Sequence, residues 1–248
     1  MKQAFIEKRF APETESLIKT CNEIIEDYLA QDLRLTLRQL YYQLVTRNVI
    51  ANEEKQYKRL SSVLSDARLA GLVDWEAIED RVRQPRTPLE FRDLSHRIDS
   101  ACANYRLDRW KGQHTYCELW VEKDALAGVL EPLAHKHHVT MMVNRGYSSQ
   151  SAMYDAAERF IDAEEREGRL FYLGDLDPSG EDMVRDIQSR LELFGARVQV
   201  EKIALTSEQV RQHKPPPNPA KLTDPRAADY VAKHGNQSWE VDALPPRV

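Results

Sequence analysis

Several features that would assign a chain to a class at once are absent from this sequence. No apolar run approaches the roughly 20 residues of a membrane-spanning helix, and the N-terminus MKQAFIEKRF lacks the apolar core of a signal peptide. The chain has no Gly-x-x-x-x-Gly-Lys loop, so this ATPase motif is also missing. Cysteine is scarce, and Cys21, Cys102 and Cys117 are far apart, which indicates buried thiols rather than a disulfide framework or a zinc site. We therefore expect a cytoplasmic protein that does not contact a membrane.

The composition is that of an ordinary globular protein. The chain has 248 residues, of which 42% are hydrophobic and 30% charged, and this length suffices for one large domain or two modest ones. The net charge of −5 argues mildly against nucleic acid as a partner. However, residues 1–111 contain 19 Lys and Arg against 18 Asp and Glu, whereas residues 112–248 contain 16 against 22. The acidic excess thus belongs to the second part of the chain.

The first part of the chain is predicted to be helical. Apolar residues recur at helical spacing in four segments, which are residues 11–31, 35–50, 55–70 and 91–105. Thr36 is a candidate N-cap for the second helix. In that helix Tyr41 belongs to the apolar arc, whereas Tyr42 falls outside it and lies one turn from Arg38. We expect Tyr41 in the core and Tyr42 on the exposed side.

The third predicted helix has a polar face with basic character. Opposite its apolar face it carries Lys55, Lys58, Arg59, Ser62 and Asp66. Two amphipathic helices with a short connection, of which the second has a Lys, Arg and Ser face, are typical of a helix-turn-helix or winged-helix module with that face in a DNA major groove. The candidate DNA contacts are Lys55, Lys58, Arg59 and Ser62. A solvated basic surface is the alternative.

A domain junction is predicted near the middle of the chain. Two prolines in residues 83–89, RQPRTPL, indicate a break between elements, and KGQH at residues 111–114 follows the fourth helix. We place the junction at KGQH. It divides the chain into a helical domain at residues 1–111 and a second domain at residues 112–248.

Strands and helices alternate in the second domain. Strands are predicted at residues 116–122, 139–144, 170–174 and 198–205, and helices at residues 124–135, 149–167 and 181–194. This alternation implies right-handed crossovers and a mainly parallel sheet. The predicted fold class is therefore α/β, with a helical N-terminal domain followed by a mainly parallel α/β domain.

Carboxylates follow two of these strands. The third strand has the apolar, turn-bounded pattern of a strand buried on both faces, and it leads into Asp175 and Asp177. Glu122 ends the first strand. If the two strands are neighbours, three carboxylates meet at one sheet edge, where ligands of parallel sheets collect, and a divalent cation such as Mg²⁺ is their natural partner. The alternative is a solvated turn and a surface glutamate.

The loop after the second strand is a further candidate for binding DNA. Residues 144–149, NRGYSS, lie between this strand and the next helix. Their backbone amides and the side chain of Arg145 are candidates for holding a DNA phosphate. An ordinary turn with a serine cap is an equal alternative.

The tail from Thr206 differs from the rest of the domain. It contains four closely spaced prolines, which predict an extended, ordered arm without regular structure. Asp242 in this arm either joins the site or only anchors the tail. The chain ends soon after Pro245-Pro246, where a helix could start, so truncation after Val248 is an open interpretation.

The motifs VEKD and DLDPSG, together with an upstream helical Arg-x-x-Tyr-Tyr, resemble those of one family. The chain looks like the A subunit of topoisomerase VI and the related meiotic double-strand-break transesterase. The tail segment LTDPRAADYVAKHG, followed by WEVDAL, is also similar to the end of that family's metal-binding domain. The resemblance spans roughly residues 34–244, and it is closest to the short stand-alone relatives called mini-A proteins.

The resemblance implies a fold and an activity. In the family, an N-terminal winged-helix domain supplies a tyrosine and a Toprim domain supplies Mg²⁺. The tyrosine attacks a phosphodiester of double-stranded DNA and becomes joined to the 5′ end. The family also implies a homodimer, in which tyrosine and metal come from opposite subunits. A separate ATPase subunit would be needed for strand passage.

The family's functional residues match positions in this chain. The tyrosine nucleophile falls on Tyr42 and the arginine of its motif on Arg38, which is followed here by Gln39 where the family usually has aspartate. The matching residues of the Toprim part are Glu122, Lys123, Asp175 and Asp177.

Two other functions remain open. A Toprim nuclease would hydrolyse DNA with metal-bound water and use Tyr42 only as a DNA contact. A DNA-binding accessory protein would keep the metal site as a structural feature. Phosphatases of the haloacid dehalogenase type also use Asp-x-Asp, but usually after the first strand and without a glutamate on another strand.

Overall fold

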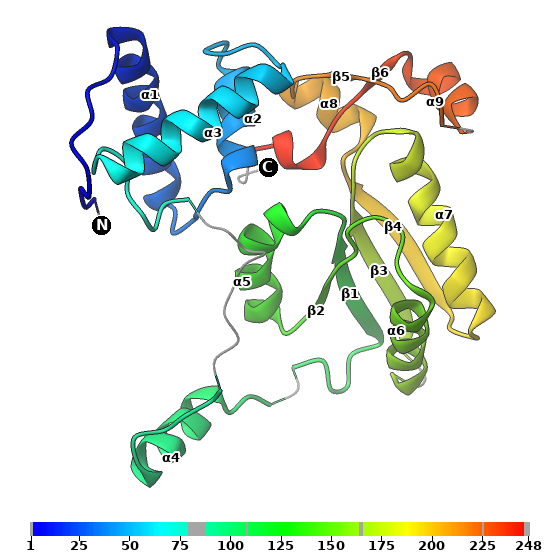
Figure 1. Ribbon diagram of the computed structural model, residues 1–248. Coiled ribbons are helices and arrows are strands. Elements are labelled where there is room, and N and C mark those ends of the chain that lie inside the picture. Colours follow the sequence, from blue (N-terminus) through cyan, green and yellow to red (C-terminus); the bar gives the residue numbers. More distant parts are fainter. Residues whose placement is uncertain (1, 79–87, 108, 164–165, 225, 246–248) are drawn as a thin grey trace.

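Helices fill the first third of the chain, and a parallel sheet with covering helices follows (Figure 1). This arrangement is seen in a computed structural model, which describes residues 2–78, 88–107, 109–163, 166–224 and 226–245. The expected α/β class is confirmed. Most of the predicted break at residues 83–89, and the chain end at residues 246–248, lie outside the described residues. No helix in the described ranges combines the length and the apolar character needed to cross a membrane.

The first three helices pack around one apolar core. They are α1 (Pro12–Leu29), α2 (Leu37–Thr46) and α3 (Glu54–Leu69). α2 begins with a capping box, because the Thr36 hydroxyl accepts a hydrogen bond from the Gln39 amide and the Gln39 side chain accepts one from the Thr36 amide. Ile24, Leu40 and Leu60 are fully buried in this core. The predicted helices and the N-cap at Thr36 are confirmed.

β-structure is sparse beside these helices. Within residues 2–78, backbone bridges join Ala4 to Ala70 and Leu35 to Ile78, and both bridges are isolated. A two-stranded wing is therefore not formed inside this described range. The winged-helix arrangement stays a prediction.

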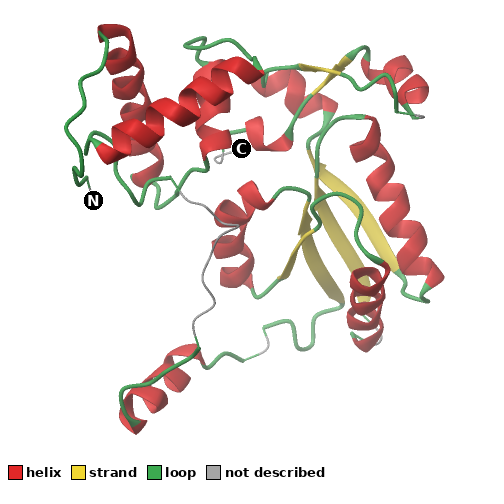
Figure 2. Cartoon of the chain, viewed as in Figure 1, coloured by secondary structure: helices red, strands yellow, loops and turns green. Residues whose placement is uncertain are grey.

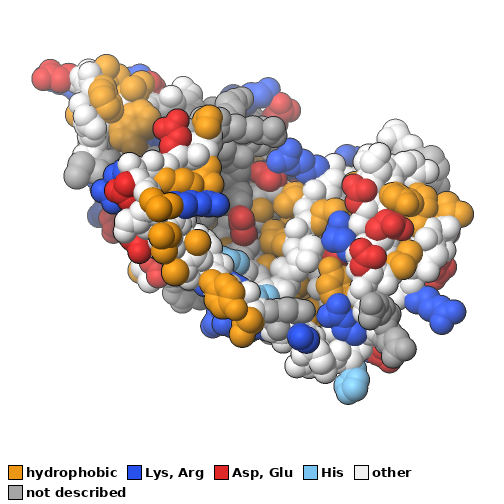
Figure 3. Space-filling model, turned by 90° about the horizontal axis from the view of Figure 1, so that it is seen from below, with side chains coloured by type: hydrophobic (Ala, Val, Ile, Leu, Met, Phe, Trp, Pro, Cys, Tyr) orange, Lys and Arg blue, Asp and Glu red, His pale blue; other side chains and the backbone are white. Residues whose placement is uncertain are grey.

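α4 (Leu94–Asn104) lies apart from the rest of the described chain (Figure 1). None of its residues is buried, so its predicted apolar stripe faces outward. The view from below, the side on which α4 lies, shows hydrophobic side chains on the surface (Figure 3). The prediction of three buried cysteines is wrong for Cys102, which is exposed because it lies on α4, whereas Cys21 and Cys117 are buried.

The second part of the chain forms a four-stranded parallel sheet in the order β2-β1-β3-β4. Its strands are β1 (Thr115–Val121), β2 (Thr140–Val143), β3 (Glu167–Leu173) and β4 (Val198–Ala204). The connecting helices are α5 (Ala127–His137), which follows a 3₁₀ turn at Asp124–Leu126, α6 (Gln150–Asp162) and α7 (Pro178–Leu193). The predicted alternation of strands and helices is confirmed, and so is the parallel direction of the strands.

The connecting helices cover the two faces of the sheet unequally (Figure 2). α6 and α7 lie on one face, where Leu170 and Tyr172 of β3 are fully buried. α5 lies on the other face, where Phe171 and Leu173 are only half-buried. The prediction that β3 is buried on both faces is therefore wrong for the α5 face, because α5 covers that face incompletely.

The tail is an ordered arm, as predicted, but it contains short regular elements. These are α8 (Ser207–His213), β5 (Asn218–Pro219), α9 (Ala227–His234), β6 (Gln237–Ser238) and a 3₁₀ turn at Val241–Ala243, called the C-terminal turn below. Leu176 and Trp239 exchange two backbone hydrogen bonds of 2.9 Å, which fix the arm beside the sheet. Asn52 donates a hydrogen bond of 2.9 Å to the Pro217 carbonyl, and Ala243 is part of the first core. The arm thus connects the sheet to the N-terminal helices.

Candidate active site

The ends of β1 and β3 bring two carboxylates together. The two strands are neighbours, Glu122 directly follows β1, and Asp175 lies just beyond β3. The Asp175 amide donates a hydrogen bond of 2.9 Å to Oε2 of Glu122. The predicted adjacency of these two strands is therefore confirmed, and it places both acidic residues at one edge of the sheet.

Asp177, the third predicted carboxylate, is also the N-cap of α7. Its Oδ1 accepts hydrogen bonds from the Gly180 amide at 2.6 Å and from the Ser179 hydroxyl at 2.9 Å. It nevertheless borders the same cavity as Asp175. Asp177 therefore belongs to this edge, but part of its capacity to accept hydrogen bonds is used by the helix.

Lys123 is at the centre of an ion-pair network. Its Nζ lies 2.9 Å from Oδ2 of Asp175 and 3.3 Å from Oδ1 of Asp242, and it also pairs with Glu240. Burial acts to lower the pKa of Lys123, but Asp242, Asp175 and Glu240 outweigh burial and raise this pKa above its ordinary value. The ammonium stays charged, and Asp242 of the tail is a member of the site rather than a remote anchor.

Arg38 and Tyr42 reach this network from α2. Arg38 pairs with Glu240, and its Nε lies 3.6 Å from Oδ2 of Asp242. Its Nη2 donates a hydrogen bond of 3.4 Å to the Tyr42 hydroxyl. The helical spacing that puts Arg38 one turn before Tyr42 thus becomes a direct contact.

Tyr42 is buried, and the prediction of an exposed side chain is wrong. The residue is 4% exposed, which hardly differs from the 5% of Tyr41. The C-terminal turn packs against α2 and covers this side of the helix, and Glu240, which pairs with Arg38, comes 202 positions later in the chain. Burial raises the pKa of Tyr42 and Glu240 adds to the rise, whereas Arg38 acts in the opposite direction.

One cavity connects these groups. It has a volume of about 490 Å³, and its lining includes Arg38, Tyr42, Asp175, Asp177 and Glu240. One wall belongs to α2 and the start of α3, and the other belongs to the sheet edge and the arm. Both walls come from a single chain, whereas the resemblance implies that tyrosine and metal-binding residues come from opposite subunits.

The donor set of this site suits a hard divalent cation. Glu122, Asp175, Glu240 and Asp242 lie at this edge together with three cationic side chains, those of Arg38, Lys123 and Lys202, so the group carries excess negative charge when all four carboxylates are ionised. Burial raises the pKa of Asp175 to about 7, although Lys123 acts to lower it.

One carboxylate oxygen of the site has unused capacity to accept a hydrogen bond. Oδ2 of Asp242 is buried and accepts no hydrogen bond from the residues described, although Arg38 is nearby. Within the described ranges, no three His, Cys, Asp or Glu side chains are arranged to hold a metal ion as they stand. Carboxylate oxygens are the type of ligand that Mg²⁺ prefers, which is how the donor chemistry of this edge fits the ion.

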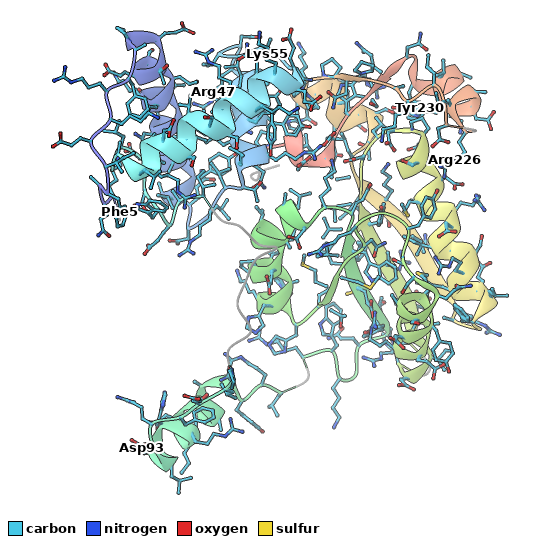
Figure 4. All side chains as sticks on the ribbon, in the orientation of Figure 1. Phe5, Arg47, Lys55, Asp93, Arg226 and Tyr230 are labelled. Atoms are coloured by element: carbon cyan, nitrogen blue, oxygen red, sulfur yellow. The ribbon has the colours of Figure 1, made fainter. Side chains whose placement is uncertain are left out.

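The predicted DNA-contacting face of α3 is exposed. Lys55, Lys58, Arg59 and Ser62 all lie on the surface, and Figure 4 shows Lys55 on this helix. Lys58 forms an ion pair of 2.6 Å with Glu54, and Arg59 one of 2.8 Å with Glu13. These acidic partners reduce the net positive charge of the face.

The loop after β2 contains the serine cap that one of the two interpretations of this segment predicted. The Ser149 hydroxyl accepts a hydrogen bond from the Ala152 amide at the start of α6. Arg145 is exposed and forms an ion pair of 3.0 Å with Asp124. Its contact with DNA phosphate stays a prediction.

The same loop also helps to hold the arm. The Tyr147 hydroxyl donates a hydrogen bond of 2.8 Å to Asp182 of α7, and Arg226 of the arm pairs with the same carboxylate at 3.0 Å. Arg226 and Tyr230 lie together on the arm beside α7 (Figure 4). Tyr230 donates to the Leu176 carbonyl at 2.7 Å. These contacts fix the arm near the sheet edge.

Two charged residues of the site were not anticipated. Glu240 gives no signal in the sequence, because its role depends on where the arm docks. Lys202 of β4 donates a hydrogen bond of 2.7 Å to the Asp175 carbonyl, and burial lowers the pKa of this lysine. The sequence does indicate that Lys202 faces inward, because it lies two residues after Val200 and four after Val198, whose side chains pack in the core.

Comparison of the sequence with protein-family models and with curated proteins finds no match. The function proposed below therefore rests on the sequence motifs and on the geometry of the site.

Proposed function

We propose that this protein cleaves double-stranded DNA by tyrosine transesterification, as its resemblance to topoisomerase VI A subunits implies. In this proposal residues 1–111 form a winged-helix-like domain, and residues 112–248 form a Toprim-like domain. The observation that carries the proposal is the single cavity bordered by Tyr42, Arg38 and Asp175. A hydroxyl nucleophile, a fixed cation and carboxylates for Mg²⁺ are the groups that such a transfer needs.

Tyr42 is the proposed nucleophile. Its hydroxyl oxygen attacks the phosphorus of a phosphodiester, a bond from this oxygen to phosphorus forms, and the bond from phosphorus to the 3′ oxygen breaks. The protein is then joined to the 5′ end. The Tyr42 hydroxyl releases its proton to solvent water, and the 3′ oxygen takes up a proton from solvent water. A phenol with an ordinary pKa near ~10 needs a nearby positive charge to react at neutral pH. Arg38 supplies that charge, because it already donates a hydrogen bond to the Tyr42 hydroxyl.

Glu122, Asp175 and Asp177 are the residues that would hold Mg²⁺. When bound there, the ion would neutralise phosphate oxygens and the charge that develops on the leaving 3′ oxygen. Lys123 orients Asp175 through the ion pair of 2.9 Å. The network around Lys123 thus keeps one proposed ligand in a defined position.

Glu240 forms ion pairs with the cationic side chains that a DNA phosphate would contact. It pairs with both Arg38 and Lys123, and it borders the cavity together with Tyr42. A phosphate that approaches Tyr42 must therefore displace this carboxylate. Glu240 acts in this proposal as a built-in competitor for the phosphate.

The proposed partners are double-stranded DNA and a second copy of the chain. Because both walls of the cavity come from one chain, a homodimer would carry two complete cavities, one for each DNA strand. Strand passage would require a separate ATPase subunit, since the Gly-x-x-x-x-Gly-Lys motif is absent.

The proposal is tested with supercoiled plasmid and Mg²⁺. The reaction is stopped with detergent, and each sample is analysed with and without protease. We expect DNA ends that stay linked to protein until proteolysis, and we expect them to vanish in Tyr42→Phe. Tyr41→Phe is the matched control, because it removes a hydroxyl from the adjacent buried tyrosine, which borders the same cavity.

Two other outcomes would redirect the proposal. Free DNA ends that persist in Tyr42→Phe indicate a hydrolytic nuclease, the second candidate, which the burial of Tyr42 favours. Binding of DNA without any cleavage indicates an accessory DNA-binding protein.

A further inference from the structure

A row of residues crosses the carboxyl end of the sheet. The parallel register pairs Val121 of β1 with Val143 of β2. The Asn144 amide donates to the Val121 carbonyl at 2.8 Å as the last regular rung, and the Arg145 amide, where the chain turns with a φ of 50°, donates to the Glu122 carbonyl at 3.0 Å. Asn144 and Glu122 therefore each follow the last paired residue of two neighbouring strands.

Both side chains project toward the face covered by α6 and α7. Side chains alternate between faces along a strand, and register partners in a parallel pair share a face. Trp120 and Met142, two residues earlier, belong to the core under α6 and α7. For Glu122 this direction is also seen directly, because the hydroxyl of Tyr172 in the same core lies 3.4 Å from its Oε2.

Gly174 of the neighbouring chain segment leaves space for the Glu122 carboxylate. A Cβ at position 174 would lie 2.8 Å from Oε2 of Glu122. The same oxygen accepts the hydrogen bond from the Asp175 amide. Since β1 lies between β2 and β3, Glu122 has Asp175 on one side and Asn144 on the other.

Asn144 is the residue of this row whose side-chain amide lacks a hydrogen-bond partner in the described protein. Both polar atoms of its side-chain amide are buried, and neither has a hydrogen-bond partner among the residues described. An unpaired buried amide is costly, and native proteins rarely keep one without a reason. Its position beside a proposed cation ligand supplies that reason.

We propose that Asn144 is a further ligand of the cation site, with its Oδ1 binding a hard divalent cation next to Glu122. The inference rests on the cation site of the proposed function and not on the tyrosine chemistry. Amide oxygens are ordinary ligands of such cations. A neutral ligand also adds no negative charge to an edge that already holds Glu122, Asp175 and Asp242. Nδ2 of Asn144 stays free to donate to an oxygen of the bound phosphate.

The test measures Mn²⁺ binding to the full chain without DNA, by electron paramagnetic resonance of the free ion, together with the melting temperature in chelator. Asn144→Leu should weaken Mn²⁺ binding by about tenfold or more. It should not lower the melting temperature, because no hydrogen bond within the described protein is lost. Asn144→Asp should retain Mn²⁺ binding, because it keeps an oxygen ligand, but should lower the melting temperature in chelator by placing a like charge beside Glu122.

Controls separate this inference from other causes. Asn22→Leu replaces a half-buried amide that already has a partner, the Leu72 carbonyl at 2.9 Å, and should leave Mn²⁺ affinity unchanged. Glu122→Gln should also weaken Mn²⁺ binding, because it removes the negative charge of this ligand. Equal Mn²⁺ affinity in the wild type and Asn144→Leu would overturn the assignment, and so would an equal loss in the Leu and Asp variants. Because no DNA is present, the result does not depend on whether Tyr42 cleaves DNA.

Discussion

The two walls of the cavity are built in different ways. On one wall Asp175 lines the cavity and Glu122 lies against it, because neighbouring parallel strands end at the same edge. On the other wall Tyr42 is buried at the cavity because the C-terminal turn, which is distant in sequence, packs against α2. A site made by strand ends follows from local patterns, whereas a site made by docking of a remote segment does not. Variants that disturb one wall at a time test this comparison.

The largest effect is expected at the sheet wall from Lys123→Met. The Lys123 side chain is only 16% exposed, and its loss leaves Asp175 and Asp242 buried without their ammonium partner. We expect the free energy of unfolding to fall by about 3–5 kcal/mol, measured by urea denaturation without Mg²⁺. The control Lys58→Met removes an exposed ion pair and should cost less than about 0.5 kcal/mol. Similar losses in both variants would show that the network is not a buried one.

A smaller effect is expected at the α2 wall from Ala243→Asp. Ala243 is 2% exposed in the core formed by α1, α2 and α3. A carboxylate there should loosen the C-terminal turn and lower the free energy of unfolding by about 2 kcal/mol. Tyr42 should then become accessible to nitration, which mass spectrometry can locate. Tyr41 provides an internal reference, because its hydroxyl is bonded to Asn52 at 3.0 Å, independently of the turn. Destabilisation without increased nitration of Tyr42 would show that the turn does not control its exposure.

Glu240→Gln affects both sides of the cavity, because Glu240 pairs with Arg38 of α2 and with Lys123 at the sheet edge. The variant removes the charge that pairs with Arg38 and Lys123 and that, in the proposed function, competes with phosphate for them. We expect tighter binding of a short DNA duplex by ~1 kcal/mol, or about fivefold, measured by fluorescence anisotropy at constant salt. Weaker DNA binding by this variant would mean that Glu240 supports the site instead of competing with DNA.

The smallest effect is expected outside the cavity, on the exposed face of α3. If Lys55 contacts a DNA phosphate, Lys55→Ala should reduce the slope of log affinity against log salt by about 0.9, because one fewer counterion is released. Lys58→Ala is the matched variant, and its change should be smaller, since Lys58 already pairs with Glu54. An unchanged slope for Lys55→Ala would remove α3 from the DNA interface.

Strand patterns allowed much of the sheet wall to be predicted. The alternation of segments indicated the parallel sheet, and the positions of Glu122 and Asp175 after two of its strands indicated that they would meet if these strands were neighbours, which they are. Lys202 was missed although it interrupts an apolar alternation in β4. The pairing of its ammonium with the Asp175 carbonyl needs the order of β3 and β4, which the sequence alone does not specify.

The α2 wall was predicted less well for a physical reason. Helical periodicity places Tyr42 on the less apolar side of α2, but it contains no information about a segment that docks there from the other end of the chain. Glu240 and the burial of Tyr42 both depend on that docking. α4 shows the opposite error, since an apolar stripe predicts a packed helix, yet no residue of α4 is buried.

The central claim is that Tyr42 forms a covalent bond with DNA, and the most direct measurement is mass spectrometry of the protein after Mg²⁺-dependent reaction with plasmid and nuclease digestion. We expect a nucleotide adduct on the peptide that contains Tyr41 and Tyr42. This adduct should remain in Tyr41→Phe and be absent from Tyr42→Phe. Cleaved DNA without any adduct on this peptide, or an adduct that persists in Tyr42→Phe, would contradict the account.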